Sequence, residues 1–123
     1  MSGKFTPKVP VKLEKPKDDP FTSKDLLKFD GIQSDKIYVA IKRVVFDVSK
    51  NPKAYGSGKG YHCFVGKDAS RGLGKSSLSA EDNDPKISYK FDDLNEKETK
   101  VLNDWYTYFE KRYNIVGKVI DLD

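Results

Sequence analysis

The chain has 123 residues and a mass of 14.0 kDa, which suits one folded domain and excludes a multidomain enzyme. Its hydrophobic content is 37% and its mean hydropathy −0.70, and it contains neither an apolar run of membrane-spanning length nor an apolar leader after Met1, so we expect a soluble, unexported chain. The formal net charge of +4 resides in residues 1–17, which carry five lysines and one glutamate. The acidic and basic side chains of the remaining residues balance, so the rest of the chain has no net charge, and we expect no nucleic-acid partner.

A single cysteine and a single histidine restrict the chemistry further. Cys63 can form no internal disulfide and no Cys-x-x-Cys site, and we expect it to be buried and inert in a reducing compartment. A multi-histidine metal site cannot be built, and a Ser-His-Asp arrangement could form only around His62. We expect His62 to be a solvated or packed side chain, and the protein not to be an enzyme.

Residues 1–20 are rich in lysine, proline and aspartate, a composition typical of a disordered basic arm. Two interpretations of the arm remain open: a plain solvated tether, or a segment that holds the protein at an anionic membrane surface. The folded domain is expected over residues 21–120.

The first half of this domain predicts a short helix and a hairpin. Thr22 can cap a helix that carries Asp25 in its first turn and stops at Gly31. The β-branched and aromatic runs 36–41 and 44–48 are separated by two residues, the spacing of a tight hairpin.

Loops and helices follow. We expect a long functional loop over residues 49–60, a brief helix through residues 69–73 capped by Asp68, and a surface loop over residues 76–90. Apolar residues then recur at helical spacing from Asn95 to Tyr113, with a capping box at the start and an apolar face that we assign to the core. Residues 115–120 predict a strand at a sheet edge.

Residues 69–76 nearly fit the phosphate-loop pattern, with Ala69 in place of its first glycine. Such a loop directly follows a buried strand and opens a long helix. Here Lys67 and Asp68 precede it and a polar loop follows, so we reject a nucleotide site.

The tyrosines are more informative, because Tyr55 and Tyr61 flank a glycine loop where the backbone could approach a flat ligand closely. Tyrosine can ligate ferric haem as a phenolate. From composition alone, packing remains an alternative role for these rings.

Five blocks of residues resemble the membrane-associated progesterone receptor (MAPR) family, and together they cover roughly residues 20–119. The blocks are Phe21-Thr22-x-x-x-Leu26 with Lys28-Phe29-Asp30-Gly31; Val45-Phe46-Asp47-Val48-Ser49; Tyr55-Gly56; Tyr61-x-x-Phe64-x-Gly66-Lys67-Asp68-Ala69-Ser70-Arg71-Gly72-Leu73; and Trp105-x-x-x-Phe109-x-x-Arg112-Tyr113-x-x-Val116-Gly117-Lys118.

The resemblance implies an α+β, cytochrome b5-like fold: a small mixed sheet, short helices that form a haem pocket, and one long C-terminal helix. It also implies that Tyr61 is the iron ligand and that Tyr55, Arg112 and Tyr113 surround the haem. Haem held between two histidines is excluded, because the chain has one histidine.

The chain departs from the family at its glycine loop. Relatives often have Tyr-Gly-Pro-x-Gly-Pro-Tyr, whereas residues 55–61 contain no proline, and we expect a looser loop. Lys59 could compensate by lying near the Tyr61 phenolate, and His62 offers a competing ligand. Family members usually carry an N-terminal membrane helix, which is absent from this sequence.

The resemblance implies a non-catalytic haem-binding protein that supports or regulates haem-thiolate monooxygenases of sterol synthesis. A sterol ligand and a haem-mediated homodimer are further partners it suggests. The expected location is cytoplasmic, with the cytosolic face of the endoplasmic reticulum as one site. The alternative function is a haem-free sterol-binding or protein-interaction adaptor.

Overall fold

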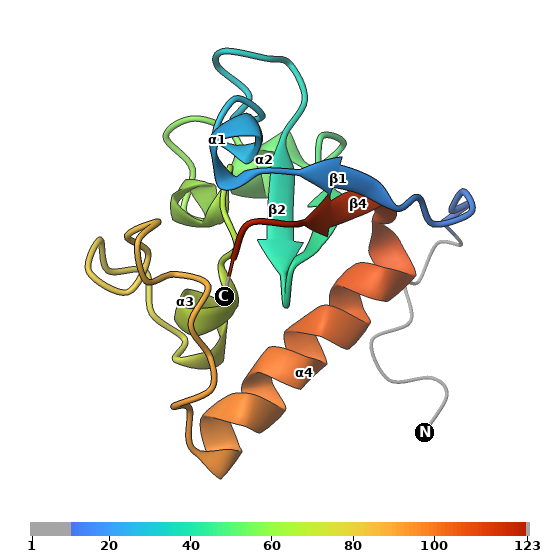
Figure 1. Ribbon diagram of the computed structural model, residues 1–123. Coiled ribbons are helices and arrows are strands. Elements are labelled where there is room, and N and C mark those ends of the chain that lie inside the picture. The colour runs from blue at the N-terminus through green and yellow to red at the C-terminus, as the bar shows by residue number, and fades with distance from the viewer. Residues whose placement is uncertain (1–10, 123) are drawn as a thin grey trace.

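The computed structural model describes residues 11–122 and contains one sheet with helices on both sides (Figure 1). The strands follow the order β1-β4-β3-β2, with β1 parallel to β4 and the other pairs antiparallel, so the sheet is mixed as expected. In chain order the elements are β1 (Asp19–Phe21), α1 (Ser23–Leu26), β2 (Tyr38–Ile41), β3 (Val44–Asp47), α2 (Pro52–Tyr55), the 3-10 helix η1 (His62–Phe64), α3 (Ser70–Gly74), α4 (Glu96–Arg112) and β4 (Asn114–Val119).

The predicted hairpin is confirmed, and its two-residue turn lacks the usual Asn-Gly. Lys42 and Arg43 both adopt positive φ angles, 51° and 70°, the backbone that matches the twist of a tight hairpin. The Lys42 N–H donates to Ser70 Oγ at 2.7 Å, and the Arg43 N–H donates to Asp68 Oδ2 at 2.7 Å. These bonds stabilise a turn that the two side chains themselves disfavour.

The last strand corrects the sequence expectation, because β4 lies inside the sheet between β1 and β3 and not at an edge. The edge position is taken by β1, which pairs Asp19 with Gly117 in parallel register. Lys17 extends this contact through its N–H, which donates to the Ile115 carbonyl at 3.0 Å. The sheet therefore starts inside the predicted arm of residues 1–20; residues 1–10 of that arm lie outside the described residues.

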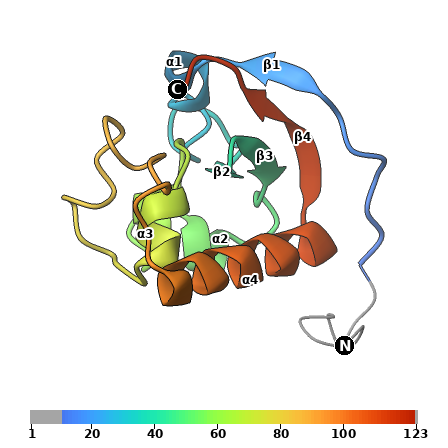
Figure 2. The same cartoon turned by 60° about the horizontal axis from the view of Figure 1, so that its bottom comes forward.

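Side chains alternate between the two faces of the sheet, and each face has its own core. On one face the strands pack against α2, α3 and α4 around Phe46, Phe109 and Leu102, all fully buried. On the other face, Leu26 of α1 packs against Ala40, Val45 and Val119 of the strands. Figure 2 shows α2, α3 and α4 together on one side of the sheet and α1 on the other.

Local capping explains where the first and last helices begin. Asn95 and Glu98 form the predicted capping box at α4. Thr22 caps α1 as predicted, and its bond is reciprocated by Asp25, which completes a second capping box. Helix α1 ends at Leu26, well before Gly31.

Two further elements differ from expectation. The predicted loop 49–60 contains α2, started by Pro52 at its first turn. Asp68 does not cap α3, since Ala69 occupies the cap position without a side-chain bond. The buried Asp68 carboxylate instead accepts hydrogen bonds from Arg43 N and from Ser70 N and Oγ. Burial raises the pKa of Asp68 to about 6.

Candidate functional site

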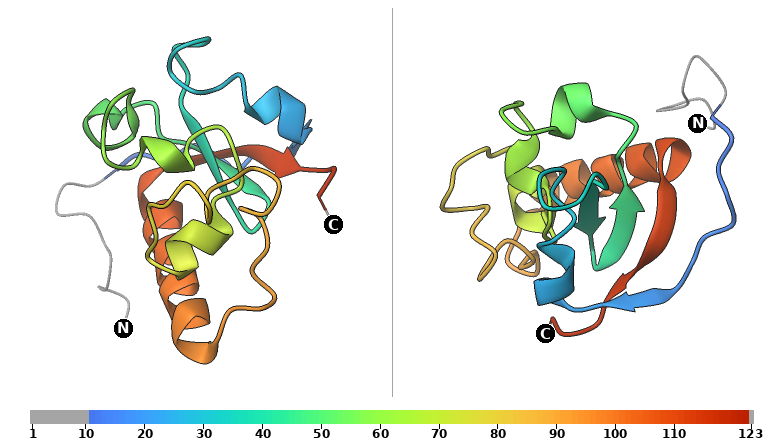
Figure 3. Two further views of the ribbon diagram at one scale, coloured as in Figure 1. Left: turned by 90° about the vertical axis from the view of Figure 1, so that its left-hand side faces the viewer. Right: turned by 90° about the horizontal axis from the view of Figure 1, so that it is seen from above.

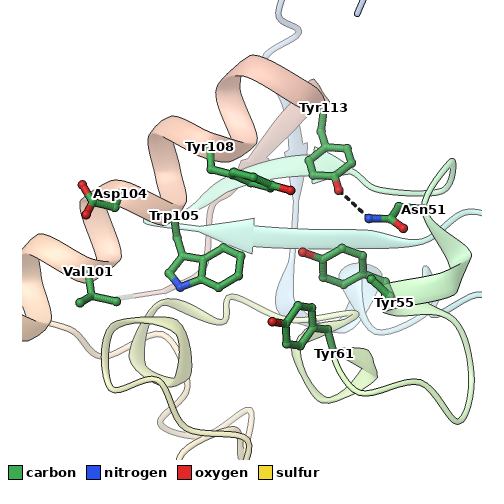
Figure 4. A pocket seen from close by; sticks show the side chains of 9 residues that line it. Asn51, Tyr55, Tyr61, Val101, Asp104, Trp105, Tyr108 and Tyr113 are labelled. Atoms are coloured by element: carbon green, nitrogen blue, oxygen red, sulfur yellow. Dashed lines mark hydrogen bonds between the residues drawn. The ribbon is translucent and has the colours of Figure 1, made fainter. Parts of the chain in front are cut away.

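The main pocket, of about 390 Å³, opens between α2, the glycine loop and one side of α4 (Figure 4). Tyr55 and Tyr61 form one wall and Trp105 and Tyr108 the other, and Figure 4 shows the hydroxyls of Tyr55, Tyr61 and Tyr108 turned toward the same space. The full lining consists of Asn51, Ala54, Tyr55, Tyr61, Val101, Asp104, Trp105, Tyr108 and Tyr113. An aromatic cavity with few polar groups is the usual character of a ligand site.

A second cavity, the side pocket of about 300 Å³, lies against the main pocket. Tyr61 and Trp105 line both cavities, and their rings meet edge to face with centroids 5.9 Å apart. The remaining lining is Phe64, Gly72, Leu73, Ser76 and Leu78. The two rings therefore form a wall shared by both cavities.

Hydrogen bonds at both ends of the glycine loop position Tyr61. The Tyr61 N–H donates to the Ala54 carbonyl at 3.0 Å, and the Lys59 N–H donates to the Gly56 carbonyl at 3.0 Å. Gly58 adopts a φ of 78°, which a side chain would strain. The loop that we expected to be looser is thus tied to α2, and Figure 3 shows α2 and the loop set to one side of the molecule near α4.

His62 adds a tie of its own and faces neither cavity. Its Nδ1 lies 2.9 Å from the Tyr55 carbonyl and takes the donor role there, because a carbonyl only accepts. His62 lines neither the main nor the side pocket, so it does not compete with Tyr61 as a ligand to a molecule bound in the main pocket. Cys63, half-buried against the core, has a pKa raised by burial, in keeping with an inert thiol.

The three predicted tyrosines differ in their exposure to solvent. Tyr55 is 2% exposed, and burial raises its pKa far above the ordinary value, as do the neighbouring tyrosines. Burial also raises the pKa of Tyr113, whose hydroxyl accepts from Asn51 Nδ2 at 2.9 Å. Tyr61 is the most exposed of the three, at 36%. It is therefore the phenol that solvent and an approaching cation reach most easily.

Arg112, which the resemblance implies to be near the haem, lies behind a wall of the main pocket. It is absent from the lining of the main pocket, and its guanidinium lies over the ring of Tyr108, with Cζ 4.1 Å from the centroid. The Nε atom is buried without a hydrogen-bond partner. Arg112 backs the pocket through Tyr108, a contact that the four-residue spacing on one helix could have indicated.

Other pocket residues lie on the part of α4 assigned to the core. Leu102 and Phe109 are fully buried, as expected, whereas Val101, Trp105 and Tyr108 are half-buried and line the main pocket. The latter three recur at helical spacing one position away from the core residues. The helix thus has two apolar stripes, and the spacing alone does not separate them.

The donor set in the main pocket fits haem held by an anionic oxygen ligand. A flat macrocycle would need apolar walls, for which Trp105 and Tyr108 are placed, and a hard ligand for ferric iron, for which the Tyr61 hydroxyl is the candidate oxygen. Among the described residues no group of three or more histidine, cysteine, aspartate or glutamate side chains is placed to hold a bare metal ion. Nor does any helix in residues 11–122 combine the length and apolar character needed to cross a bilayer.

Comparison with known proteins places this chain in a family. The profile described as "Cytochrome b5-like Heme/Steroid binding domain" matches residues 22–118. A solved structure from Arabidopsis thaliana, described as having a cytochrome b5 like fold, is 45% identical and superimposes with a TM-score of 0.74, covering 88% of this chain and 96% of that one.

Curated relatives agree with this assignment. Probable steroid-binding protein 3 of Arabidopsis thaliana is 48% identical over 81% of this chain and 97% of its own length. Cytochrome P450 regulator dap1 of Schizosaccharomyces pombe is 37% identical over 81% of this chain, and membrane-associated progesterone receptor component 2 of Rattus norvegicus is 32% identical over 97% of it. The alignments span only 62% and 54% of these two longer relatives. The chain therefore belongs to the cytochrome b5-like heme/steroid-binding domain family, among the MAPR proteins.

Proposed function

We propose that the protein binds haem in the main pocket, with the Tyr61 phenolate as the iron ligand, and catalyses no reaction of its own. The observation that carries this proposal is the position of Tyr61, the most exposed of the three candidate tyrosines, at an aromatic cavity that neither His62 nor Cys63 lines. The loop that presents Tyr61 is tied to α2 at both ends, so the phenol is held in place before a ligand arrives.

The remaining site residues have supporting roles in this proposal. Tyr55 stays protonated, because its pKa is strongly raised, and can donate a hydrogen bond into the cavity. Tyr113 is oriented by Asn51, and Arg112 holds the Tyr108 wall. Haem bound through an anionic oxygen favours the ferric state and is hard to reduce, which suits sensing, carriage or regulation more than electron shuttling.

The partner class in this proposal is a haem-thiolate monooxygenase of sterol synthesis. Support comes from the relative named as a cytochrome P450 regulator and from the steroid-binding names of others. Tyr61, which lines the main pocket and is 36% exposed, would be accessible to such a partner or to a second copy of this chain, the latter as a haem-mediated homodimer. An oxidase activity of the isolated protein would contradict the non-catalytic part of the proposal.

The proposed location is the cytosol, with the endoplasmic reticulum surface as one site of action. The lysines of residues 1–17 could contribute about 1 kcal/mol each near anionic lipid. Truncation at Pro20 would cut strand β1, so the test replaces these five lysines by serine in the full chain. If the wild-type chain co-sediments with phosphatidylserine vesicles and the serine variant does not, the arm attaches the protein to the membrane. If the two proteins sediment equally with the vesicles, the arm is a solvated tether.

A second candidate function, a haem-free sterol-binding or interaction adaptor, is favoured by the charges around the main pocket. Haem carries two carboxylates, yet Asp104 is the charged side chain among the lining residues, and Arg112 is turned onto Tyr108. A neutral ligand would meet no such repulsion.

Hemin titration separates the two functions. The haem function predicts saturable uptake of one hemin per chain, with an iron spectrum changed by Tyr61→Phe and left unchanged by His62→Ala. Weak, nonsaturating uptake that ignores Tyr61→Phe would favour the adaptor. A spectrum altered only by His62→Ala would show that the tyrosine assignment is wrong.

A further inference from the structure

A separate cavity, the α1 pocket of about 190 Å³, lies on the sheet face opposite the main pocket. It is bounded by α1, residues 66–68, residues 85–89 and the segment that follows β4. Leu26 and Val119 form a buried apolar floor, at 0% and 4% exposed, and Leu27 lines the pocket with 45% of its surface exposed. The α1 pocket therefore has a dry interior and an opening to solvent.

The segment after β4 is fastened across one side of this pocket. Ser23 donates from its N–H and its hydroxyl to Asp121 Oδ1, at 2.9 and 2.8 Å, and the Ile120 N–H donates to the Phe21 carbonyl at 2.9 Å. Leu122, which is half-buried, completes the wall on this side, and Figure 2 shows the segment returning to α1. These bonds form the cavity before any ligand enters it.

Two lysines line the α1 pocket, and neither forms a salt bridge with a residue in the described part of the chain. Lys24 is exposed, whereas Lys67 is half-buried and donates from Nζ to the Asn83 carbonyl at 2.9 Å. Burial lowers the pKa of Lys67, and the charge of Asp84 opposes this change only in part. A half-buried ammonium group without a carboxylate partner is under-compensated, and an anion beside it would supply the missing charge.

The acidic residue in the lining is already engaged elsewhere. Asp68 Oδ2 accepts from the Arg43 N–H of the hairpin turn, and Asp68 Oδ1 accepts from the N–H and the hydroxyl of Ser70. Both carboxylate oxygens thus take their hydrogen bonds from the hairpin and from α3. The lysines of the pocket are left to a ligand.

We propose that the α1 pocket binds a short monocarboxylate, with its hydrocarbon part on the floor of Leu26 and Val119 and its carboxylate between Lys24 and Lys67. The volume is below the range of about 300–1,000 Å³ that is usual for drug-sized ligands, so the hydrocarbon part must be short. Because this pocket and the main pocket share no lining residue, the inference goes beyond the proposed haem function and does not depend on it.

The test is titration of the ¹⁵N-labelled full chain with hexanoate at pH 7, followed by amide chemical shifts, with 1-hexanol as the uncharged ligand of equal length. We expect saturable shifts at Leu27, Gly66 and Leu122 and none at Ala54 or Trp105, which line the main pocket. Hexanol should bind about tenfold more weakly or worse, because it cannot form a charge-assisted bond with an ammonium group.

Charge variants identify the groups that hold the carboxylate. Lys67→Gln and Lys24→Gln should each weaken hexanoate binding, Lys67→Gln by about tenfold. The matched control is Lys28→Gln, an equal charge change at an exposed position of the chain that lies outside the pocket lining, and it should stay within about twofold of wild type. Circular dichroism checks that each variant folds. Lys24 is exposed, so its variant serves even if Lys67→Gln does not fold.

Four results would overturn the inference. These are the absence of any shift with hexanoate, shifts centred on Ala54 and Trp105, equal affinity for hexanoate and hexanol, and lysine variants of the pocket that bind hexanoate as well as Lys28→Gln does. The comparison of hexanoate with hexanol uses the wild-type chain alone, so it decides the question without any variant.

Discussion

Asp68 makes the stability of the protein depend on pH in a direction opposite to that of most carboxylates. Asp68 is 4% exposed, and its side chain joins the hairpin turn at Arg43 to the start of α3 at Ser70. Its backbone forms an isolated parallel bridge with Ala40 of β2. Burial raises its pKa from 3.8 to about 6, although hydrogen bonds from Ser70 and Arg43 oppose the rise. The folded state therefore binds a proton more tightly than the unfolded chain.

The magnitude follows from the pKa change. At 1.36 kcal/mol per pKa unit, protonation of Asp68 contributes about 3 kcal/mol to the free energy of unfolding. This contribution is fully present below pH 3.8 and is lost as the pH rises through 6. Between pH 7 and pH 5 the free energy of unfolding should rise by about 1.4 kcal/mol from this residue. Asp25, Asp30 and Asp93 have lowered pKa values, so their contributions are lost only at more acid pH.

Urea unfolding at pH 5, 6 and 7 measures this effect in wild type and in Asp68→Asn, which removes the titration and keeps the size of the side chain. Asp47→Asn on the same hairpin is the matched control and should keep the wild-type slope. The difference between wild type and Asp68→Asn should grow by about 1.4 kcal/mol on going from pH 7 to pH 5. A difference that is constant or shrinks over this range would refute the reasoning.

Two further predictions concern packing around the pockets. Gly72→Ala should lower the free energy of unfolding by about 1–3 kcal/mol, because the added Cβ would overlap Asn83 Oδ1. In the control Gly60→Ala the added Cβ meets nothing within 4 Å, so its thermal unfolding midpoint should stay close to that of wild type. Equal unfolding midpoints for the two variants would contradict this prediction. Arg112→Ala should lower the free energy of unfolding, measured in urea, by about 1 kcal/mol, because the contact with the Tyr108 ring is lost. Arg112→Lys should restore only part of this stability, since an ammonium group cannot stack on the ring. Full restoration of the stability by lysine would argue against stacking.

Elements defined by local pattern could be predicted from the sequence. Two β-branched runs at two-residue spacing indicate the hairpin. The Thr22 cap indicates the start of α1 and the Asn95–Glu98 capping box the start of α4, and both signals require only neighbouring residues. The position of β4 could not be predicted, because it depends on the parallel pairing of Asp19 with Gly117, far apart in the chain. Such pairing leaves no periodic signal.

The site divides in the same way. Tyr61, Tyr55 and Tyr113 were identified through the resemblance, and the structure brings all three to the main pocket. Asn51 was missed, because its role is a hydrogen bond to Tyr113 across the fold. Asp68 and Ser70, which belong to one of the blocks that carry the resemblance, have a structural role: both side chains hold the hairpin turn, and neither lines the main pocket.

The identity of the iron ligand tests the account most directly. Resonance Raman spectra of the hemin-loaded full chain, excited in the phenolate-to-iron charge-transfer region, should show phenolate ring modes in wild type. These modes should persist in Tyr55→Phe and Tyr113→Phe and vanish in Tyr61→Phe. A wild-type spectrum without them, or one in which Tyr61→Phe retains them, would contradict ligation by Tyr61.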